Sequence, residues 1–306
     1  MKIHINTLRI LVVVMMIFLN ENSFSQQISE KEFAENIFGS SQLINSQTAV
    51  IPAAGTWRFG IQHRFGKIGL DSSITQQFLG LDLPSVIRFS FGWTLGDRLA
   101  LDIGRTNYLK TYDLELKYLI ARQTTNFRMP FNMAFYFNAA YRSERFPSVP
   151  ANAYFEDDTT IFIYKPSHRL SYNSQLILSS KITDKFSVQL SPIFIYENLA
   201  DPYTDNFTLV LSAGARYKLG FSTAIVAEYA YVFNNRGDSK FYDPFSLGVE
   251  FGTVGHSFQL FISNAPRVLE SHIYTISSVN IAAGEFLLGF NLKRSFWNKK
   301  SSQSSL

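Results

Sequence analysis

The stretch IRFSFGWTLGDRLALDIGRT, residues 87–106, decides the fold class because apolar and polar residues alternate on both sides of one tight turn. Before the turn at 95–98, Phe89, Phe91 and Trp93 share one face of the chain. After the turn, aliphatic residues occupy every second position. Strict alternation around a short Gly-Asp turn is typical of a β-hairpin. The stretch leaves open whether its aromatic face contacts a protein core or lipid.

The same alternation recurs in twelve runs between residues 55 and 297. Each run has roughly 9–12 residues, the length that a tilted strand needs to cross a bilayer. Short polar turns follow the even-numbered runs, and mostly longer connections follow the odd-numbered ones, apart from a short link at 107–110. This asymmetry is typical of outer-membrane barrels. We therefore expect an all-β fold, a transmembrane antiparallel up-and-down β-barrel of about 12 strands.

The composition of the chain favours a membrane barrel over a typical soluble domain. Hydrophobic residues make up 46% of the sequence and charged residues only 17%, against roughly 25% charged residues in average globular proteins. After the apolar run at 10–19, no stretch approaches the roughly 18 residues of a membrane-spanning helix. A closed barrel is then the structure that crosses a membrane with every backbone group paired. The net charge of +4 is too small to indicate nucleic-acid binding.

The first 25 residues have the features of a secretory signal peptide. Lys2 and Arg9 give a positive start, an apolar run of ten residues follows, and Ser23 and Ser25 supply small residues near a cleavage site. An uncleaved anchor is the alternative, although ten apolar residues are too few for a spanning helix. The chain has no cysteine, which excludes disulfides, thiolate metal sites and lipid attachment at cysteine. We expect export to the cell outer membrane.

The remaining boundaries follow from where the alternation begins and ends. Residues 26–54 do not alternate cleanly and are expected to form a periplasmic N-terminal segment. This segment either hangs in the periplasm or folds into the lumen as a plug, and the sequence does not choose between the two. Residues 55–297 form the expected outer-membrane barrel, and residues 298–306 form a polar C-terminal tail.

The tryptophans mark one rim of the expected barrel. Trp57 begins the first run, Trp93 ends the second, and Trp297 follows the twelfth, so all three fall at the predicted periplasmic rim. Further aromatic residues join this rim or line the opposite one. Amphipathic rings prefer membrane interfaces. We therefore expect the three tryptophans to be interface anchors.

The face opposite the aromatic residues is expected to line the lumen. It carries mostly Gly, Ala, Ser, Thr, Asn and Gln with scattered charges, which suits a crowded lumen better than a water-exposed surface. The charges are of mixed sign and need partners or water in a low-dielectric wall. They form either a structural ion-pair network or a polar passage for a small solute. The charged candidates are Arg58, Arg64, Arg88, Asp102, Asp113, Glu115, Lys117, Arg216, Lys218, Glu228, Glu250, Glu285 and Lys293.

Five stretches resemble an uncharacterised Bacteroidetes outer-membrane β-barrel family that carries a domain-of-unknown-function label. They are FGSSQLIN (38–45), QHRFGK (62–67), GRTNYLKTYDLELKYLIARQ (104–123), GHSFQLFISN (255–264) and GFNLKRSF (289–296). The resemblance covers nearly the whole mature chain. It implies an outer-membrane location, and it supplies no substrate, reaction or catalytic residue.

The residue pattern gives little support for catalysis or metal binding. His63 lies on the apolar, outward-facing side of the first alternating run, where an outer-membrane phospholipase would carry a lipid-facing histidine. No serine and carboxamide with suitable spacing accompany it, and it reaches either the lipid headgroups or the lumen. The acidic loop clusters at 156–158 and at Asp201 and Asp205 match no metal-binding motif. We expect no enzyme activity, no metal and no cofactor.

The favoured function is a narrow channel or binding barrel for a small polar solute in the outer membrane. Three alternatives stay open: a structural or accessory barrel with a closed lumen, an outer-membrane lipid-modifying enzyme, and a soluble secreted ligand-binding barrel with its aromatic residues inside. The expected partners are outer-membrane lipid and a small polar solute, without nucleic acid. The oligomeric state is not set by any of these patterns.

Overall fold

The computed structural model describes residues 33–71, 73–150, 152–155, 159–200, 204–234, 241–253 and 255–296. The expected signal peptide, Trp297, the C-terminal tail, Asp201 and the acidic cluster at 156–158 lie outside the described residues. Within these ranges, no helix is long and apolar enough to cross a membrane.

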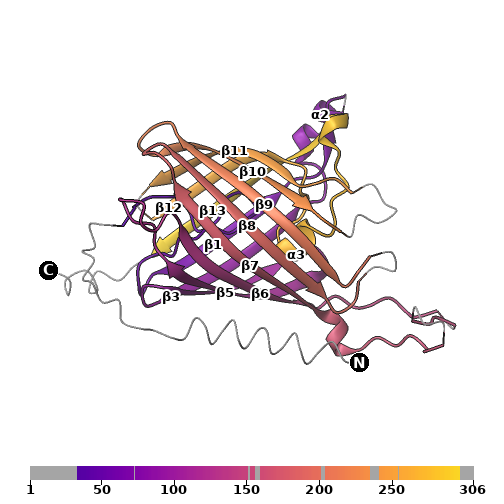
Figure 1. Cartoon of the computed structure of the whole chain (residues 1–306). Helices are drawn as coiled ribbons and strands as arrows, with labels where there is room; N and C mark the ends of the chain where they lie inside the picture. Colours follow the sequence, from indigo (N-terminus) through magenta and orange to yellow (C-terminus); the bar gives the residue numbers. More distant parts are fainter. Residues whose placement is uncertain are drawn as a thin grey trace, which may run out of the picture. The chain divides into compact units, whose positions relative to one another are not determined.

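The described residues form one antiparallel sheet of twelve long strands that closes on itself (Figure 1). Each long strand pairs with the next along the chain, and the first also pairs with the last, with Trp57 opposite Phe296. The expected twelve-stranded barrel is thereby confirmed. The long strands are β1 (Trp57–Arg64), β3 (Val86–Leu95), β4 (Leu99–Thr106), β5 (Thr111–Ala121), β6 (Asn132–Arg142), β7 (Leu170–Lys181), β8 (Phe186–Glu197), β9 (Phe207–Lys218), β10 (Thr223–Val232), β11 (Phe245–Thr253), β12 (His256–Ser263) and β13 (Glu285–Phe296).

The outer face of the barrel carries large exposed apolar side chains. In β3, Phe91 is 59% exposed while its neighbour Ser90 is buried, and the same alternation runs along β8. Trp57 and Trp93 stack across β1 and β3 with ring centroids 5.0 Å apart, both on the exposed face. An apolar surface that surrounds a whole barrel indicates contact with lipid, because soluble proteins rarely expose large apolar patches. The soluble barrel with inward aromatic residues is therefore wrong.

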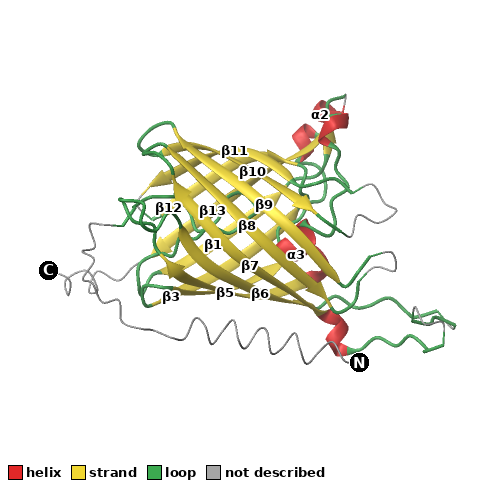
Figure 2. Ribbon diagram, viewed as in Figure 1, coloured by secondary structure: helices red, strands yellow, loops and turns green. Residues whose placement is uncertain are grey.

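The two ends of the barrel differ in their connections (Figure 2). Short turns such as 96–98, 182–185 and 219–222 join strands at one end, and long connections such as 65–85 and 264–284 join them at the other. We call the short-turn end the periplasmic end, following the general asymmetry of outer-membrane barrels. The long connections hold the short elements β2 (Ile68–Gly69), α2 (Ser73–Gln76), η2 (Phe78–Gly80), η3 (Tyr108–Lys110), η4 (Pro166–Arg169), α3 (Glu270–Ile273) and η5 (Ile281–Ala283).

The segment before β1 enters the barrel. It starts at the periplasmic end, where Phe33 bridges to Thr124. It then forms a tight turn closed by a bridge between Gln42 and Gln47, and returns to β1 through a backbone hydrogen bond from Gly55 N to Thr94 O of 2.9 Å. We call residues 37–49 the N-terminal hairpin. Most of its residues are buried, so the segment lies inside the barrel and does not hang free.

The lumen contains a packed apolar core in addition to polar groups. Three clusters join inward-facing strand residues to the N-terminal hairpin or to the 264–284 connection. In one, Ile44 of the hairpin packs with Val226 and Phe261. In another, Ile273 and Tyr274 pack against inward-facing β8, β9 and β10 residues. The expectation of a mainly small and polar lumen face is incomplete, because the inserted segments bring apolar side chains that need apolar partners.

Candidate functional site

One wall of the lumen, built by β1 and β3–β5, carries a network of buried ion pairs. Arg58 Nη2 lies 2.5 Å from Asp102 Oδ2. Arg88 forms ion pairs with Asp113 and, at 2.6 Å, with Glu115. The glycine at position 104 makes room for this network, since a Cβ there would lie 2.4 Å from a guanidinium nitrogen of Arg88. The network neutralises charges that would be costly to bury alone.

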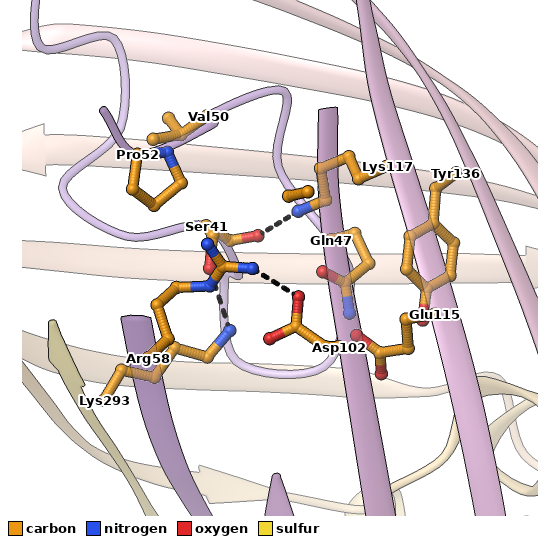
Figure 3. A pocket seen from close by; sticks show the side chains of 11 residues that line it. Ser41, Gln47, Val50, Pro52, Arg58, Asp102, Glu115, Lys117, Tyr136 and Lys293 are labelled. Carbon is orange, nitrogen blue, oxygen red and sulfur yellow. Dashed lines mark hydrogen bonds and ion pairs between the residues drawn. The ribbon is translucent and has the colours of Figure 1, made fainter. Parts of the chain in front are cut away.

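Two lysines extend this wall to the N-terminal hairpin (Figure 3). Lys117 Nζ donates to the backbone oxygen of Ser41 at 2.7 Å, and Lys293 Nζ lies 3.1 Å from Ser41 Oγ. These lysines line, with Arg58 and Glu115, a cavity of about 10 Å³. A volume of this size holds about one water molecule. Between the hairpin and this part of the wall, the cavity is therefore too small for any solute larger than water.

Glu228 of β10 holds the tip of the N-terminal hairpin. Its carboxylate accepts hydrogen bonds from Asn45 N at 2.7 Å, from Ser46 N at 3.1 Å and from Ser46 Oγ at 2.9 Å. A buried carboxylate needs such donors to offset the loss of water. The amides of the turn supply them, so the hairpin tip and Glu228 stabilise one another.

Arg64 of β1 holds the same tip from another strand. One of its guanidinium nitrogens donates to Ile44 O at 3.2 Å and to Asn45 Oδ1 at 3.0 Å. The guanidinium also lies over the ring of Phe261, 4.5 Å from its centroid. Asn291 of β13 adds a hydrogen bond of 2.8 Å to Ile44 O. The tip is thus fixed between β1, β13 and β10, which are not all neighbours in the sheet.

A buried ion pair of the barrel wall lies directly beside the chain where it enters the hairpin. Arg216 Nε donates to Glu250 Oε1 at 2.8 Å, and Gln259 Nε2 donates to Glu250 Oε2 at 3.0 Å. The backbone passes so close to this pair that a Cβ at Gly39 would lie 2.4 Å from Glu250 Oε1. Only glycine fits there without displacing the ion pair.

A segment from the long-loop end meets the hairpin inside the barrel. The helix α3 is buried and packs against β7 and β8 (Figure 2). Glu270 Oε1 on this helix accepts a hydrogen bond of 3.1 Å from Gln47 Nε2, and Gln189 of β8 donates to Gln47 O at 2.7 Å. Burial raises the pKa of the Glu270 carboxyl to about 7. Two segments that are not part of the barrel wall therefore meet inside the lumen and fill part of it.

A family comparison agrees with this architecture. The sequence profile of the family described as "Membrane bound beta barrel domain (DUF5777)" matches residues 38–296. The chain belongs to this family. The match begins inside the N-terminal hairpin, so the family profile includes most of the hairpin as well as the barrel. This DUF5777 protein is an outer-membrane β-barrel, since a closed antiparallel barrel with a lipid-facing apolar belt is the spanning architecture of that membrane.

The solved structures similar to this DUF5777 barrel include a porin, an outer membrane channel and an outer membrane phospholipase. The KdgM porin matches with a TM-score of 0.46 and 11% identity over 78% of this chain and 99% of that one. An outer membrane channel from Pseudomonas putida F1 matches with a TM-score of 0.47 and 11% identity over 81% and 97% of the two chains. Outer membrane phospholipase A from Escherichia coli, as an active-site mutant, matches with a TM-score of 0.40 and 13% identity over 80% and 91%. A search of curated proteins finds no match.

Most of the charged residues expected in the lumen of this DUF5777 barrel are brought together there, but Glu285 is not. Glu285 pairs with Lys67 at 2.7 Å, and both side chains are partly exposed. The start of β13 extends to pair with β2, which places Glu285 at the outer rim instead of in the lumen. Lys218 lies at the periplasmic end of β9 and is partly exposed.

The residues that hold the inserted segments together are not visible in the alternating pattern of the sequence. Asn45, Ser46, Gln47 and Glu270 are uncharged or lie outside the alternating runs, so periodicity gave no reason to select them. The one signal was the resemblance of the stretch 38–45 to the family, because this stretch contains the start of the hairpin tip.

His63 and His272 are placed against aromatic rings in the described structure. His63 faces outward and stacks on Phe290 with ring centroids 5.1 Å apart, next to Phe65 at 4.3 Å. Its Nδ1 has no hydrogen-bond partner among the described residues, so nothing orients the ring as a base. His272 is buried on α3 against Tyr108, and burial lowers its pKa to about 3. The described residues contain no group of three side chains that would hold a metal ion.

Proposed function

We propose that this protein is an outer-membrane channel for small polar solutes that its N-terminal hairpin holds closed. The observation that carries the proposal is the set of hydrogen bonds from Asn45 and Ser46 to Glu228 at the hairpin tip. They hold an inserted segment in the lumen, where the cavity between hairpin and wall is only about 10 Å³. The hairpin is a separate insertion and not part of the sheet, so it can leave without breaking any strand pairing.

The lining that the hairpin covers suits a polar solute. Lys117 and Lys293 point at Ser41, and Glu228 and Arg64 bind the tip through polar contacts. Withdrawal of the hairpin would leave these side chains facing a water-filled lumen. Their mixed signs favour small polar solutes in general over ions of one sign.

Planar bilayer recordings test this proposal. Deletion of residues 26–54 removes the hairpin and leaves every barrel strand intact. We expect the deletion variant to conduct several-fold more than the full chain. The control is Ser187→Ala, a substitution at a buried position of β8 outside the hairpin contacts, which should leave the conductance unchanged. Equal conductance of the deletion variant and the full chain would contradict the proposed role of the hairpin.

A structural barrel with a permanently closed lumen is the second candidate. It is favoured by the three apolar clusters inside the barrel, because a conducting lumen is usually polar throughout. In that case the deletion variant stays silent in the bilayer although it is inserted.

We further infer that the barrel does not hydrolyse lipid, because His63 lacks an orienting hydrogen-bond partner on Nδ1. Release of fatty acid from phospholipid that is lost in His63→Ala would overturn this inference. The signal peptide at 1–25 and a Bacteroidetes source stay predictions from the sequence.

A further inference from the structure

A block of four uncharged polar residues forms part of the inner wall on β6 and β7. Tyr136 lies opposite Gln175, and Asn138 lies opposite Asn173, in the register of the two strands. All four side chains face inward and are at most 1% exposed. We call these four residues the carboxamide patch.

The carboxamide patch has polar atoms without partners in the described structure. They are the hydroxyl of Tyr136, Nδ2 of Asn138, and both amide atoms of Asn173 and of Gln175. Proteins hydrogen-bond nearly all of their buried polar groups, so a cluster of unpartnered ones on two adjacent strands needs an explanation. Elsewhere in this lumen, Glu228 and Asn291 are hydrogen-bonded to the hairpin, and Gln62 Nε2 and Arg64 Nε are single unpartnered atoms on residues that have other partners.

The patch is covered by segments that do not belong to the barrel wall. Ala49 of the N-terminal hairpin packs with Tyr136. The helix α3 packs against β7 and β8, and Ser271 on this helix and Ser191 on β8 add two more unpartnered hydroxyls. Gln47 and Glu270 join the two covering segments by a hydrogen bond of 3.1 Å. The patch is thus a wall surface that would become accessible only if these segments moved.

The chemistry of the patch favours a neutral ligand with many hydroxyl groups. A carboxamide offers donors and an acceptor side by side, and a hydroxyl group can use both. The charged groups nearby are already engaged, because Arg88 pairs with Asp113 and Glu115. Lys117 Nζ also lies near the patch, 6.0 Å from the centroid of the Tyr136 ring, and donates to Ser41 O in the closed state, while the four residues of the patch carry no charge themselves. Carboxamides, a phenol and serine hydroxyls match the hydroxyl groups of a sugar.

We propose that the carboxamide patch binds the hydroxyl groups of a neutral sugar when the N-terminal hairpin and α3, which cover it in the closed state, have moved away. This proposal rests on the proposed channel function only for the route by which the sugar arrives. Binding itself requires only that the two covering segments open at times.

The test is equilibrium binding of radiolabelled raffinose to the detergent-solubilised full chain, repeated in a Glu228→Ala background that weakens the hold on the hairpin. We expect saturable binding that is stronger in the Glu228→Ala background. The double substitution Asn173→Leu with Gln175→Leu should weaken it at least tenfold. Ser187→Ala on β8, which lies outside the patch, is the matched control and should bind like the parent. Asn138→Ala is a milder second variant, expected to weaken binding severalfold, in case the double variant fails to fold.

Three outcomes overturn the proposal. The first is no raffinose binding in either background, and the second is binding as strong as the parent's in the folded Asn138→Ala and double variants. The third is preferential binding of galacturonate over raffinose. The first of these leaves bound water as the partner of the patch. A barrel that binds raffinose but stays silent after deletion of residues 26–54 refutes the channel alone. A barrel that conducts after the deletion but ignores raffinose refutes the sugar site alone.

Discussion

At the scale of single residues, Glu228 shows how a buried carboxylate can hold a segment inserted from outside the barrel wall. Its carboxylate faces the amides of Asn45 and Ser46, which lie far away in the sequence, and the side chain is 7% exposed. Hydrogen bonds to a charged group contribute more than neutral ones, and each partner left alone in the interior costs free energy. The closed position of the hairpin therefore depends strongly on one acidic residue.

Glu228→Ala should release the hairpin part of the time. The loss of hydrogen bonds to a charged partner costs about 2 kcal/mol, which corresponds to a roughly 30-fold larger released fraction. Since the chain has no cysteine, Ala49→Cys makes a single buried reporter on the hairpin. We expect a water-soluble maleimide to label it about 30-fold faster in Glu228→Ala than in the parent. Glu285→Ala, at the outer rim, is the control and should leave the rate unchanged; equal rates in all three proteins would refute the role of Glu228.

At the scale of elements, the hairpin fits into the barrel because particular strand positions lack side chains. Gly214 of β9 faces the hairpin, and a Cβ there would lie 2.3 Å from Leu43 Cδ1. At Gly39 the roles are reversed, since the hairpin backbone approaches the Glu250 carboxylate of β11. Close packing of this kind tolerates no added volume. The strands and the hairpin are therefore matched in shape as well as in polarity.

Gly214→Val should push the hairpin tip out of its seat. Overpacking costs typically about 1–3 kcal/mol, and here the hairpin gives way more easily than the paired strands of the barrel. We expect an increased bilayer conductance with unchanged barrel stability. Gly220→Ala, in the turn between β9 and β10 with no atom within 4 Å of the added Cβ, should behave like the parent. A destabilised barrel without any gain in conductance would contradict this account.

At the scale of the whole molecule, closure of the sheet removes both of its edges. The apolar side chains on the outer face then contact lipid, where those of a soluble protein would contact a protein core. Pairing of β1 with β13 leaves no long strand unpaired along its length. The exposed apolar side chains then form a belt around the barrel, with Trp57 and Trp93 at its periplasmic rim. The interior is filled by inserted chain. The molecule is thus packed on the inside like a soluble protein and apolar on the outside.

The lipid-facing belt predicts a difference between two isoleucines of similar exposure. Ile103 lies in the middle of β4 and is 61% exposed, and Ile161 lies in the 143–169 connection and is 65% exposed. A lysine on the lipid face near the membrane midplane destabilises a barrel by about 2–4 kcal/mol. We expect Ile103→Lys to lower the urea midpoint of unfolding in lipid vesicles clearly and Ile161→Lys to leave it unchanged. Equal midpoints of the two variants would place Ile103 outside the membrane.

The strands could be predicted from the sequence because the signal that forms them is local. Each of the twelve runs alternates with a period of two residues, and the connections alternate in length, so strand number, facing and closure follow from the pattern. The β-hairpin expected at residues 87–106 is observed as β3 and β4, with Trp93 facing outward and Arg88 facing inward. The charged lumen candidates were selected by the same alternation, which fails at strand ends: Glu285 lies where β13 extends to pair with β2, and Lys218 lies at the partly exposed end of β9.

The sequence by itself therefore determined the barrel, its lipid-facing side and its inward-facing charges. Only the tertiary structure decided that the lumen is closed, and which residues close it. The hairpin has no periodic pattern, and its partners are distant in the sequence: Asn45 and Glu228 are 183 residues apart. Such contacts depend on the shape and charge of a lumen that exists only after all twelve strands have closed, so no local signal in the chain specifies them.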